Sequence, residues 1–63
     1  MKINKGETYG AFLKRVRLKA KLTQTELALR LGYHPATICA WENGRNIPPF
    51  TQRVIDKFAL NLK

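Results

Sequence analysis

The chain has 63 residues, which is enough for one small domain. Hydrophobic residues make up 44% of it, so the composition favours a compact core over disorder. The 12 Lys and Arg residues outnumber the 4 Asp and Glu residues, and the net charge of +8 favours nucleic acid as the partner, ahead of an anionic membrane surface or a merely basic soluble surface.

Residues that carry catalytic or metal chemistry are scarce. Cys39 is the only cysteine and His34 the only histidine, so the sequence offers neither an intramolecular disulfide nor a zinc site. It has no serine, no nucleophile motif, no Gly-rich phosphate loop and no apolar run of signal-peptide or transmembrane length. We therefore expect a cytoplasmic protein that is not an enzyme, needs no cofactor or metal, and binds no small molecule or membrane.

The first part of the chain predicts a flexible segment followed by a helix. Residues 1–6 are polar and are expected to be flexible. A helix is predicted from residue 7 or 8 to residue 19 or 20, because Phe12, Leu13 and Val16 share one face at helical spacing. The basic residues of this region are either phosphate contacts or a solvated face: Lys14, Arg15, Lys19 and Lys21.

A capping box predicts the second helix. Thr23-Gln24-Thr25-Glu26 has the T-x-x-E pattern, in which the threonine oxygen and the glutamate carboxylate satisfy N–H groups at the helix start. The helix is expected over residues 24–31, with Leu27, Ala28 and Leu31 inward. Gly32 is expected to end it in a left-handed conformation, which glycine reaches at little cost.

Proline marks the start of two further helices. Pro35 follows His34 at the cap position and predicts a third helix that ends at Asn43-Gly44. Pro49 predicts a fourth helix through Leu60. The residues of this helix that are expected to face inward are Val54, Ile55 and Phe58. Asn61 is expected to end the helix in a left-handed conformation. No pattern indicates strands, so the sequence predicts a compact all-α domain of four helices.

The stretch LTQTELALRLGYHPATICAWENGRNIP resembles the DNA-binding domain of the Cro and phage-repressor (Xre-like) family. The family pattern L-T-Q-x-E-L-A, L-G, I-x-x-W-E-N-G and P occurs here in order and at matching spacing, and the resemblance covers about residues 8–62. It implies a helix-turn-helix at about residues 23–43, whose second helix, about 35–43, enters the major groove of double-stranded DNA. Family members commonly carry a fifth helix that helps to form dimers, so a longer chain with five helices and a homodimer on DNA are open alternatives.

The resemblance implies a sequence-specific transcriptional regulator and assigns roles residue by residue. The alternative is a protein-interaction adaptor or an antitoxin-like module that uses the same surface to bind a protein. Arg17 and Glu42 match a structural, partly buried ion pair. Gln24 matches a residue that touches a phosphate and braces the recognition helix, with Thr25 beside it. The family's turn that contacts the DNA backbone falls on Asn43, Gly44 and Arg45. The family's base-reading positions fall on Pro35, Ala36, Thr37 and Ala40.

The outward face of the predicted recognition helix, here called its open face, carries mostly short side chains: Ala36, Cys39, Ala40 and Asn43. Its opposite face carries Ile38 and Trp41, which we interpret as core rather than as a base-stacking platform. Only Thr37 among the base-reading positions can form hydrogen bonds with its side chain, so we expect the face to read thymine methyl groups and groove shape. His34 is either a cap or a DNA contact, and Cys39 is a small reduced residue rather than a redox switch.

Overall fold

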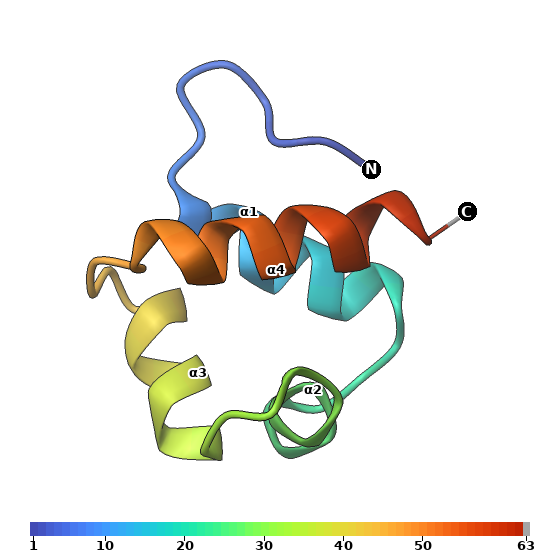
Figure 1. Ribbon diagram of the computed structural model, residues 1–63, viewed down its shortest axis with the longest axis vertical. Helices are drawn as coiled ribbons and strands as arrows, with labels where there is room; N and C mark the ends of the chain where they lie inside the picture. The colour runs from blue at the N-terminus through green and yellow to red at the C-terminus, as the bar shows by residue number, and fades with distance from the viewer. Residues whose placement is uncertain (63) are drawn as a thin grey trace.

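Four helices make up the secondary structure of residues 1–62, the part of the chain that the computed structural model describes (Figure 1). They are α1 (Tyr9–Lys19), α2 (Gln24–Leu31), α3 (Pro35–Glu42) and α4 (Pro49–Leu60). The predicted all-α fold is confirmed, and the helix bounds lie within two residues of those expected from the sequence. None of these helices combines the length and the apolar character that crossing a bilayer requires.

Side-chain caps begin the first three helices. The Ala11 N–H donates to Thr8 Oγ1 over 3.2 Å at the start of α1. The capping box of α2 is confirmed, because the Glu26 N–H donates to Thr23 Oγ1 over 3.1 Å and the Thr23 N–H donates to Glu26 Oε1 over 2.9 Å. At α3 the cap is His34. Each acceptor satisfies an N–H group that has no partner inside its helix, so local sequence fixes where these helices begin.

The helix ends agree with the sequence at α2 but not at α4. Gly32 has φ 83° and ends α2 in the predicted left-handed conformation. The same prediction for Asn61 is wrong, because its φ is −85° and its ψ is −4°. The Asn61 side-chain amide instead donates to the Lys57 carbonyl oxygen over 3.2 Å, which satisfies a last-turn acceptor without a left-handed residue. Lys21, just after α1, adopts the left-handed conformation with φ 59°, and its N–H donates to the Leu18 carbonyl oxygen over 3.1 Å.

The hydrophobic core receives side chains from all four helices and from the loop between α3 and α4. α1 packs against both α3 and α4, while α2 packs against α3. The buried hydrophobic residues are Phe12, Leu13, Val16, Leu27, Ala28, Ile38, Trp41, Ile47, Ile55 and Ala59. Trp41 is only 5% exposed, which confirms that it is a core residue and not a stacking platform on the surface.

The inward face of α4 is displaced from the one that the sequence predicts. Ile55 is fully buried as expected, and Phe58 is half-buried and packs against the core, whereas Val54 is half-buried without being part of that packing. Thr51 and Ala59, four residues before and after Ile55, are the buried positions instead. The buried line therefore runs at i, i+4 and i+8 from Thr51, and it leaves the side of α4 that carries Val54 and Phe58 at the edge of the core.

The segment before α1 makes several contacts with the helices. The Met1 amino group donates to the Ala59 carbonyl oxygen near the end of α4 over 3.1 Å. The side chains of Met1 and Ile3 pack against the core. The Arg15 guanidinium donates to the Lys2 carbonyl oxygen over 2.8 Å. These contacts would hold residues 1–6 against the domain, and the flexibility expected of them stays a prediction.

Gly10 marks the closest approach of α1 to α3. The residue is buried, and a Cβ atom added to it would overlap the Trp41 carbonyl oxygen and lie 3.3 Å from the Trp41 carbonyl carbon. Both obstacles belong to the backbone, so no change of side-chain rotamer can relieve the overlap. A glycine inside a helical pattern is the sequence signal for such a contact.

We expect Gly10→Ala to lower the free energy of unfolding by about 1–3 kcal/mol, because α1 and α3 must move apart. Urea unfolding followed by circular dichroism measures the change. A glycine in a helix without such a contact gives the opposite sign, since alanine there adds roughly 0.5–1 kcal/mol of stability. A stabilised Gly10→Ala variant would therefore contradict the close packing of α1 on α3.

Candidate nucleic-acid interface

α2 and α3 form a helix-turn-helix joined by Gly32, Tyr33 and His34. Figure 1 views α2 end-on, whereas α3 runs along the plane of the picture. Tyr33 fixes the turn at three points. Its N–H donates to the Ala28 carbonyl over 2.9 Å, its hydroxyl bonds the Thr51 hydroxyl over 3.0 Å, and its ring meets the Trp41 ring edge-on at 5.0 Å. The turn is thus held to both α3 and α4.

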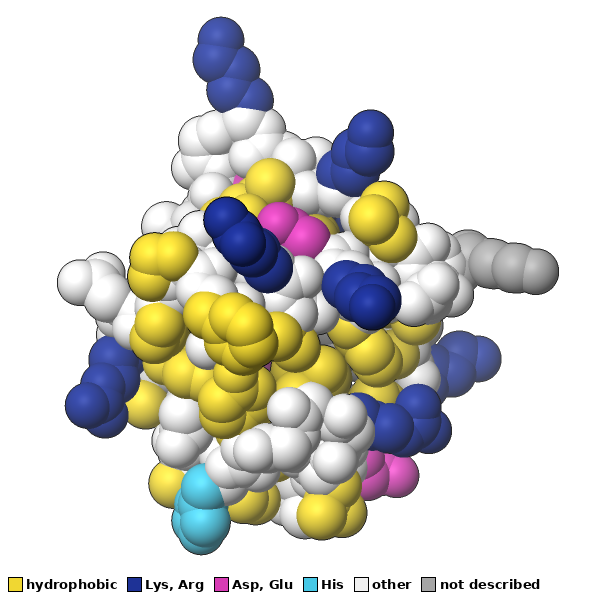
Figure 2. Space-filling model, viewed as in Figure 1, with side chains coloured by type: hydrophobic (Ala, Val, Ile, Leu, Met, Phe, Trp, Pro, Cys, Tyr) yellow, Lys and Arg dark blue, Asp and Glu magenta, His cyan; other side chains and the backbone are white. Residues whose placement is uncertain are grey.

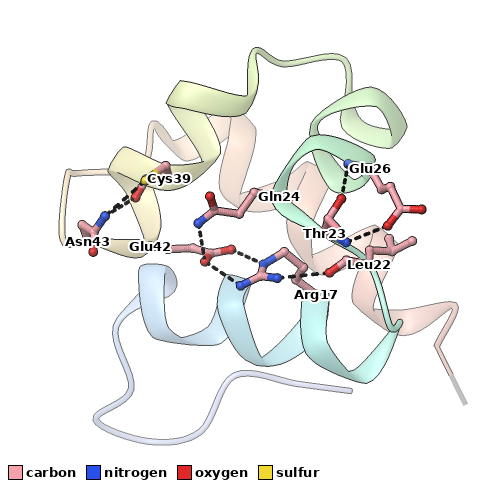
Figure 3. Close-up of polar contacts among 8 residues, drawn as sticks. All are labelled: Arg17, Leu22, Thr23, Gln24, Glu26, Cys39, Glu42 and Asn43. Carbon is pink, nitrogen blue, oxygen red and sulfur yellow. Dashed lines mark hydrogen bonds and ion pairs between the residues drawn. The ribbon is translucent and has the colours of Figure 1, made fainter.

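A partly buried ion pair fixes the end of α3 to α1 (Figure 3). The Arg17 guanidinium donates to the two carboxylate oxygens of Glu42 over 2.8 and 3.1 Å, and also to the Leu22 carbonyl oxygen over 3.1 Å. The side chains of Arg17 and Glu42 are 13% and 4% exposed. The hydrogen bond with Glu42 raises the pKa of Arg17, against the opposing effect of burial. The predicted structural pair is therefore present, partly buried and bidentate.

Gln24 joins the same network from α2. Its side-chain amide donates to Glu42 Oε1 over 3.2 Å, so residues of α1 and α2 both hold the last residue of α3 (Figure 3). This geometry shows the bracing role expected of Gln24, while its phosphate contact stays a prediction. Thr25 lies next to it in the exposed first turn of α2. The free N–H groups and the dipole of this helix end favour an anion there.

The open face of α3 carries short side chains, as the sequence predicts. Ala36 is exposed, while Pro35, Thr37 and Ala40 are half-buried. Ala40, which the sequence places on the open face with Ala36, is thus less exposed than Ala36. At the end of α3, the Arg45 N–H donates to the Ala40 carbonyl oxygen over 3.0 Å. Ala36 is consequently the position where a larger side chain would change the open face without disturbing packing.

His34 begins α3 as its cap. Its Nδ1 accepts a hydrogen bond from the Ala36 N–H over 3.1 Å, and the residue is exposed. This confirms the capping interpretation, which the sequence left beside a DNA contact. An imidazole nitrogen here replaces the oxygen of the serine or threonine that more commonly caps a helix. A contact of His34 with DNA stays a prediction.

The turn after α3 projects from the domain at the other end of the recognition helix. Asn43, Gly44 and Arg45 are all exposed, and Gly44 has φ 110°. The Asn43 side-chain amide donates back to the Cys39 carbonyl over 2.9 Å and lies 3.4 Å from the half-buried Cys39 sulfur (Figure 3). Arg45 forms no ion pair within the described residues, so its guanidinium is available to a ligand.

The sequence did not reveal two elements of this site. One is Gly10, which lets α1 approach the backbone of Trp41. The other is the hydrogen bond from Arg17 to the Leu22 carbonyl, which ties the segment before α2 to the ion pair. A helical glycine signals the first, whereas the second involves a backbone atom and has no signal in the sequence.

Comparison with known proteins agrees with this geometry. The sequence model of the family described as Helix-turn-helix matches residues 13–54, which is well over half of the chain. No curated protein and no solved structure matches the chain. The matched region runs from the core residues of α1 through the recognition helix into α4. The chain therefore belongs to the Cro and phage-repressor (Xre-like) helix-turn-helix family, whose domains bind DNA and are not enzymes.

Proposed function

We propose that this domain is a transcriptional regulator that binds specific sites on double-stranded DNA with the open face of α3 in the major groove. The observation that carries the proposal is the contrast between the two sides of α3. Its inner side is fixed by Ile38, Trp41 and the Arg17–Glu42 pair, whereas its outer side presents short side chains at Ala36 and Thr37. A rigid helix whose outward side chains are short can lie close to base edges.

The residue types on this face favour reading by shape and methyl contact. Pro35, Ala36 and Ala40 have no side-chain donor or acceptor, so their contribution is apolar contact and close approach. Thr37 adds one hydroxyl and one methyl group near the start of α3. We infer that thymine methyl groups and groove width account for most of the sequence preference, with phosphate contacts from Gln24 and the residue 43–45 turn setting the register.

The test is selection of bound duplexes from a random DNA library, followed by replacement of thymine with uracil in the selected site. Uracil lacks only the methyl group, so affinity should fall at the contacted positions, while Thr37→Val should cost little. If the threonine hydroxyl makes a base hydrogen bond instead, Thr37→Val should cost roughly 1–3 kcal/mol of binding free energy. A two-fold repeat in the selected sites would identify a homodimer on DNA, which is a further part of the proposal.

Arg45 provides a test of the backbone contact. We expect Arg45→Ala to weaken binding to selected and random duplexes alike, because phosphates carry no sequence information. The slope of log K against log salt should become shallower by about one unit if Arg45 neutralises one phosphate. Titrations at several salt concentrations measure it, with Arg53→Ala on α4 as a control of equal charge. An unchanged slope for Arg45→Ala would remove this residue from the interface.

The alternative function, binding of a protein, requires a different kind of surface on α3. A protein interface usually needs large aromatic or aliphatic anchors at its centre, and the open face of α3 has none. Binding of a protein to this face would also depend little on salt, in contrast to the steep salt dependence of phosphate contacts. A library that yields no enriched sequence, together with salt-insensitive capture of a protein by α3, would overturn the proposal.

A further inference from the structure

We propose that one side of α4, at the edge of the core, is a docking surface for an acidic amphipathic helix of another protein. The surface, here called the α4 stripe, consists of Phe50, Val54 and Phe58. It does not belong to the helix-turn-helix, and the inference does not depend on the DNA-binding proposal.

The α4 stripe is an apolar row on one side of its helix. Its three residues stand four apart, so their side chains are neighbours along about 12 Å of α4 at the helical rise of 1.5 Å per residue. Phe50 is 73% exposed, and Val54 and Phe58 are half-buried at the edge of the core. Phe50 is therefore the main exposed apolar side chain of the row, and the half-buried Val54 and Phe58 continue the row toward the core, against which Phe58 packs.

Further apolar side chains lie around α4. Tyr33 is half-buried and is attached to α4 by the hydrogen bond between its hydroxyl and that of Thr51, next to Phe50 in the chain. Figure 2 shows hydrophobic side chains gathered below α4 in this view, between α4 and the helix-turn-helix, with Lys, Arg and acidic side chains above them. On this face of the molecule, apolar side chains thus have a border in which Lys and Arg side chains predominate.

The charges around the stripe favour an acidic partner over a second copy of the chain. Arg53 and Lys57 are exposed on the outer side of α4. Neither forms an ion pair within residues 1–62. The acidic side chains of the chain are already engaged internally: Glu7 with Arg15, Glu26 with Thr23, Glu42 with Arg17, and Asp56 with the Tyr9 hydroxyl. Two copies would bring two net charges of +8 together, whereas carboxylates beside apolar anchors would complement the border.

The regular spacing favours a helix as the partner. A helix that packs along α4 presents its own apolar residues at i, i+4 and i+8, and these can lie against a row with the same repeat. A suitable probe is a synthetic helix with leucines at those positions flanked by glutamates. Its counterpart carries lysines in place of the glutamates and is otherwise identical. Fluorescence anisotropy of each labelled peptide then measures the affinity for the protein.

We expect the glutamate peptide to bind and the lysine peptide to bind at least tenfold more weakly. Phe50→Ala should weaken the glutamate peptide about tenfold, because a truncated aromatic anchor commonly costs that much. The double variant Arg53→Glu/Lys57→Glu should weaken it similarly and should gain affinity for the lysine peptide. The control Lys14→Glu/Lys19→Glu changes the net charge equally on α1, where both lysines are exposed, and should leave most of the affinity intact.

Three results would overturn the proposal. Equal binding of the two peptides would show that charge does not select the partner, and equal losses in the two double variants would show attraction by net charge alone. A dimer in sedimentation equilibrium that Phe50→Ala dissociates would identify a second copy as the occupant.

Circular dichroism should show that Phe50→Ala is folded, since Phe50 lies mostly outside the core. Its affinity for the selected DNA should match wild type, so this test and the DNA test fail independently.

Discussion

Trp41→Ala should lower the free energy of unfolding by about 3–5 kcal/mol, the usual cost of removing a large buried aromatic side chain. Trp41 is 5% exposed, packs edge-on against Tyr33 at 5.0 Å, and carries the carbonyl group against which α1 packs at Gly10. A 63-residue domain has roughly 3–9 kcal/mol of stability in total, at about 0.05–0.15 kcal/mol per residue. The variant should therefore be largely unfolded or should melt far below wild type.

Thermal and urea unfolding followed by circular dichroism measure this loss. The matched control is Leu29→Ala on α2, because Leu29 is 78% exposed and its truncation should change stability by no more than about 0.5 kcal/mol. A Trp41→Ala variant that melts like wild type but no longer binds DNA would contradict the core assignment. It would make Trp41 a contact residue instead.

Arg17→Ala should cost about 3–5 kcal/mol, because it leaves the buried Glu42 carboxylate without its charged partner. Glu42 has 4% of its side chain exposed, and its remaining partner is the Gln24 amide at 3.2 Å. The variant should also loosen the end of α3. We therefore expect its affinity for DNA to fall further than the unfolded fraction alone explains. Urea unfolding and DNA titration on the same sample separate the two effects.

Two comparisons make the Arg17 result specific. Arg15→Ala breaks the ion pair with Glu7, but Arg15 has 39% of its side chain exposed, so this change should have little effect. The double variant Arg17→Met/Glu42→Leu removes both charges together and should recover much of the stability, since no buried charge is then unpaired. If the double variant is no more stable than Arg17→Ala, the loss comes from packing rather than from an unpaired charge.

Local sequence predicted most of the fold because its helices begin with local signals. The Thr23 capping box, Pro35 and Pro49 each act within one turn, and the predicted helices follow them closely. The end of α4 was mispredicted at Asn61 because the side chain of that residue satisfies the helix carbonyl itself. The left-handed residue after α1 is Lys21, which a sequence reading does not single out since lysine has no preference for that conformation.

The prediction of which residues are buried was inaccurate where packing between helices determines burial. A helical wheel gives the inward arc of α4 only approximately. Thr51 and Ala59 are buried, whereas Val54 and Phe58 are half-buried, with Phe58 packed against the core. Ala40 was placed on the open face of α3, but it is half-buried. The Arg17–Glu42 pair was found through the family resemblance, because its two residues are far apart in the chain and no local pattern links them.

The open face of α3 is tested most directly by Ala36→Glu. Ala36 is exposed near the start of α3, and glutamate forms helices well, so the fold should remain. A carboxylate there would face the phosphates and acceptors of the major groove. We expect wild-type circular dichroism and melting temperature together with loss of binding to the selected DNA site. Wild-type affinity of a folded Ala36→Glu variant would show that α3 is not the reading helix and would contradict the proposed function.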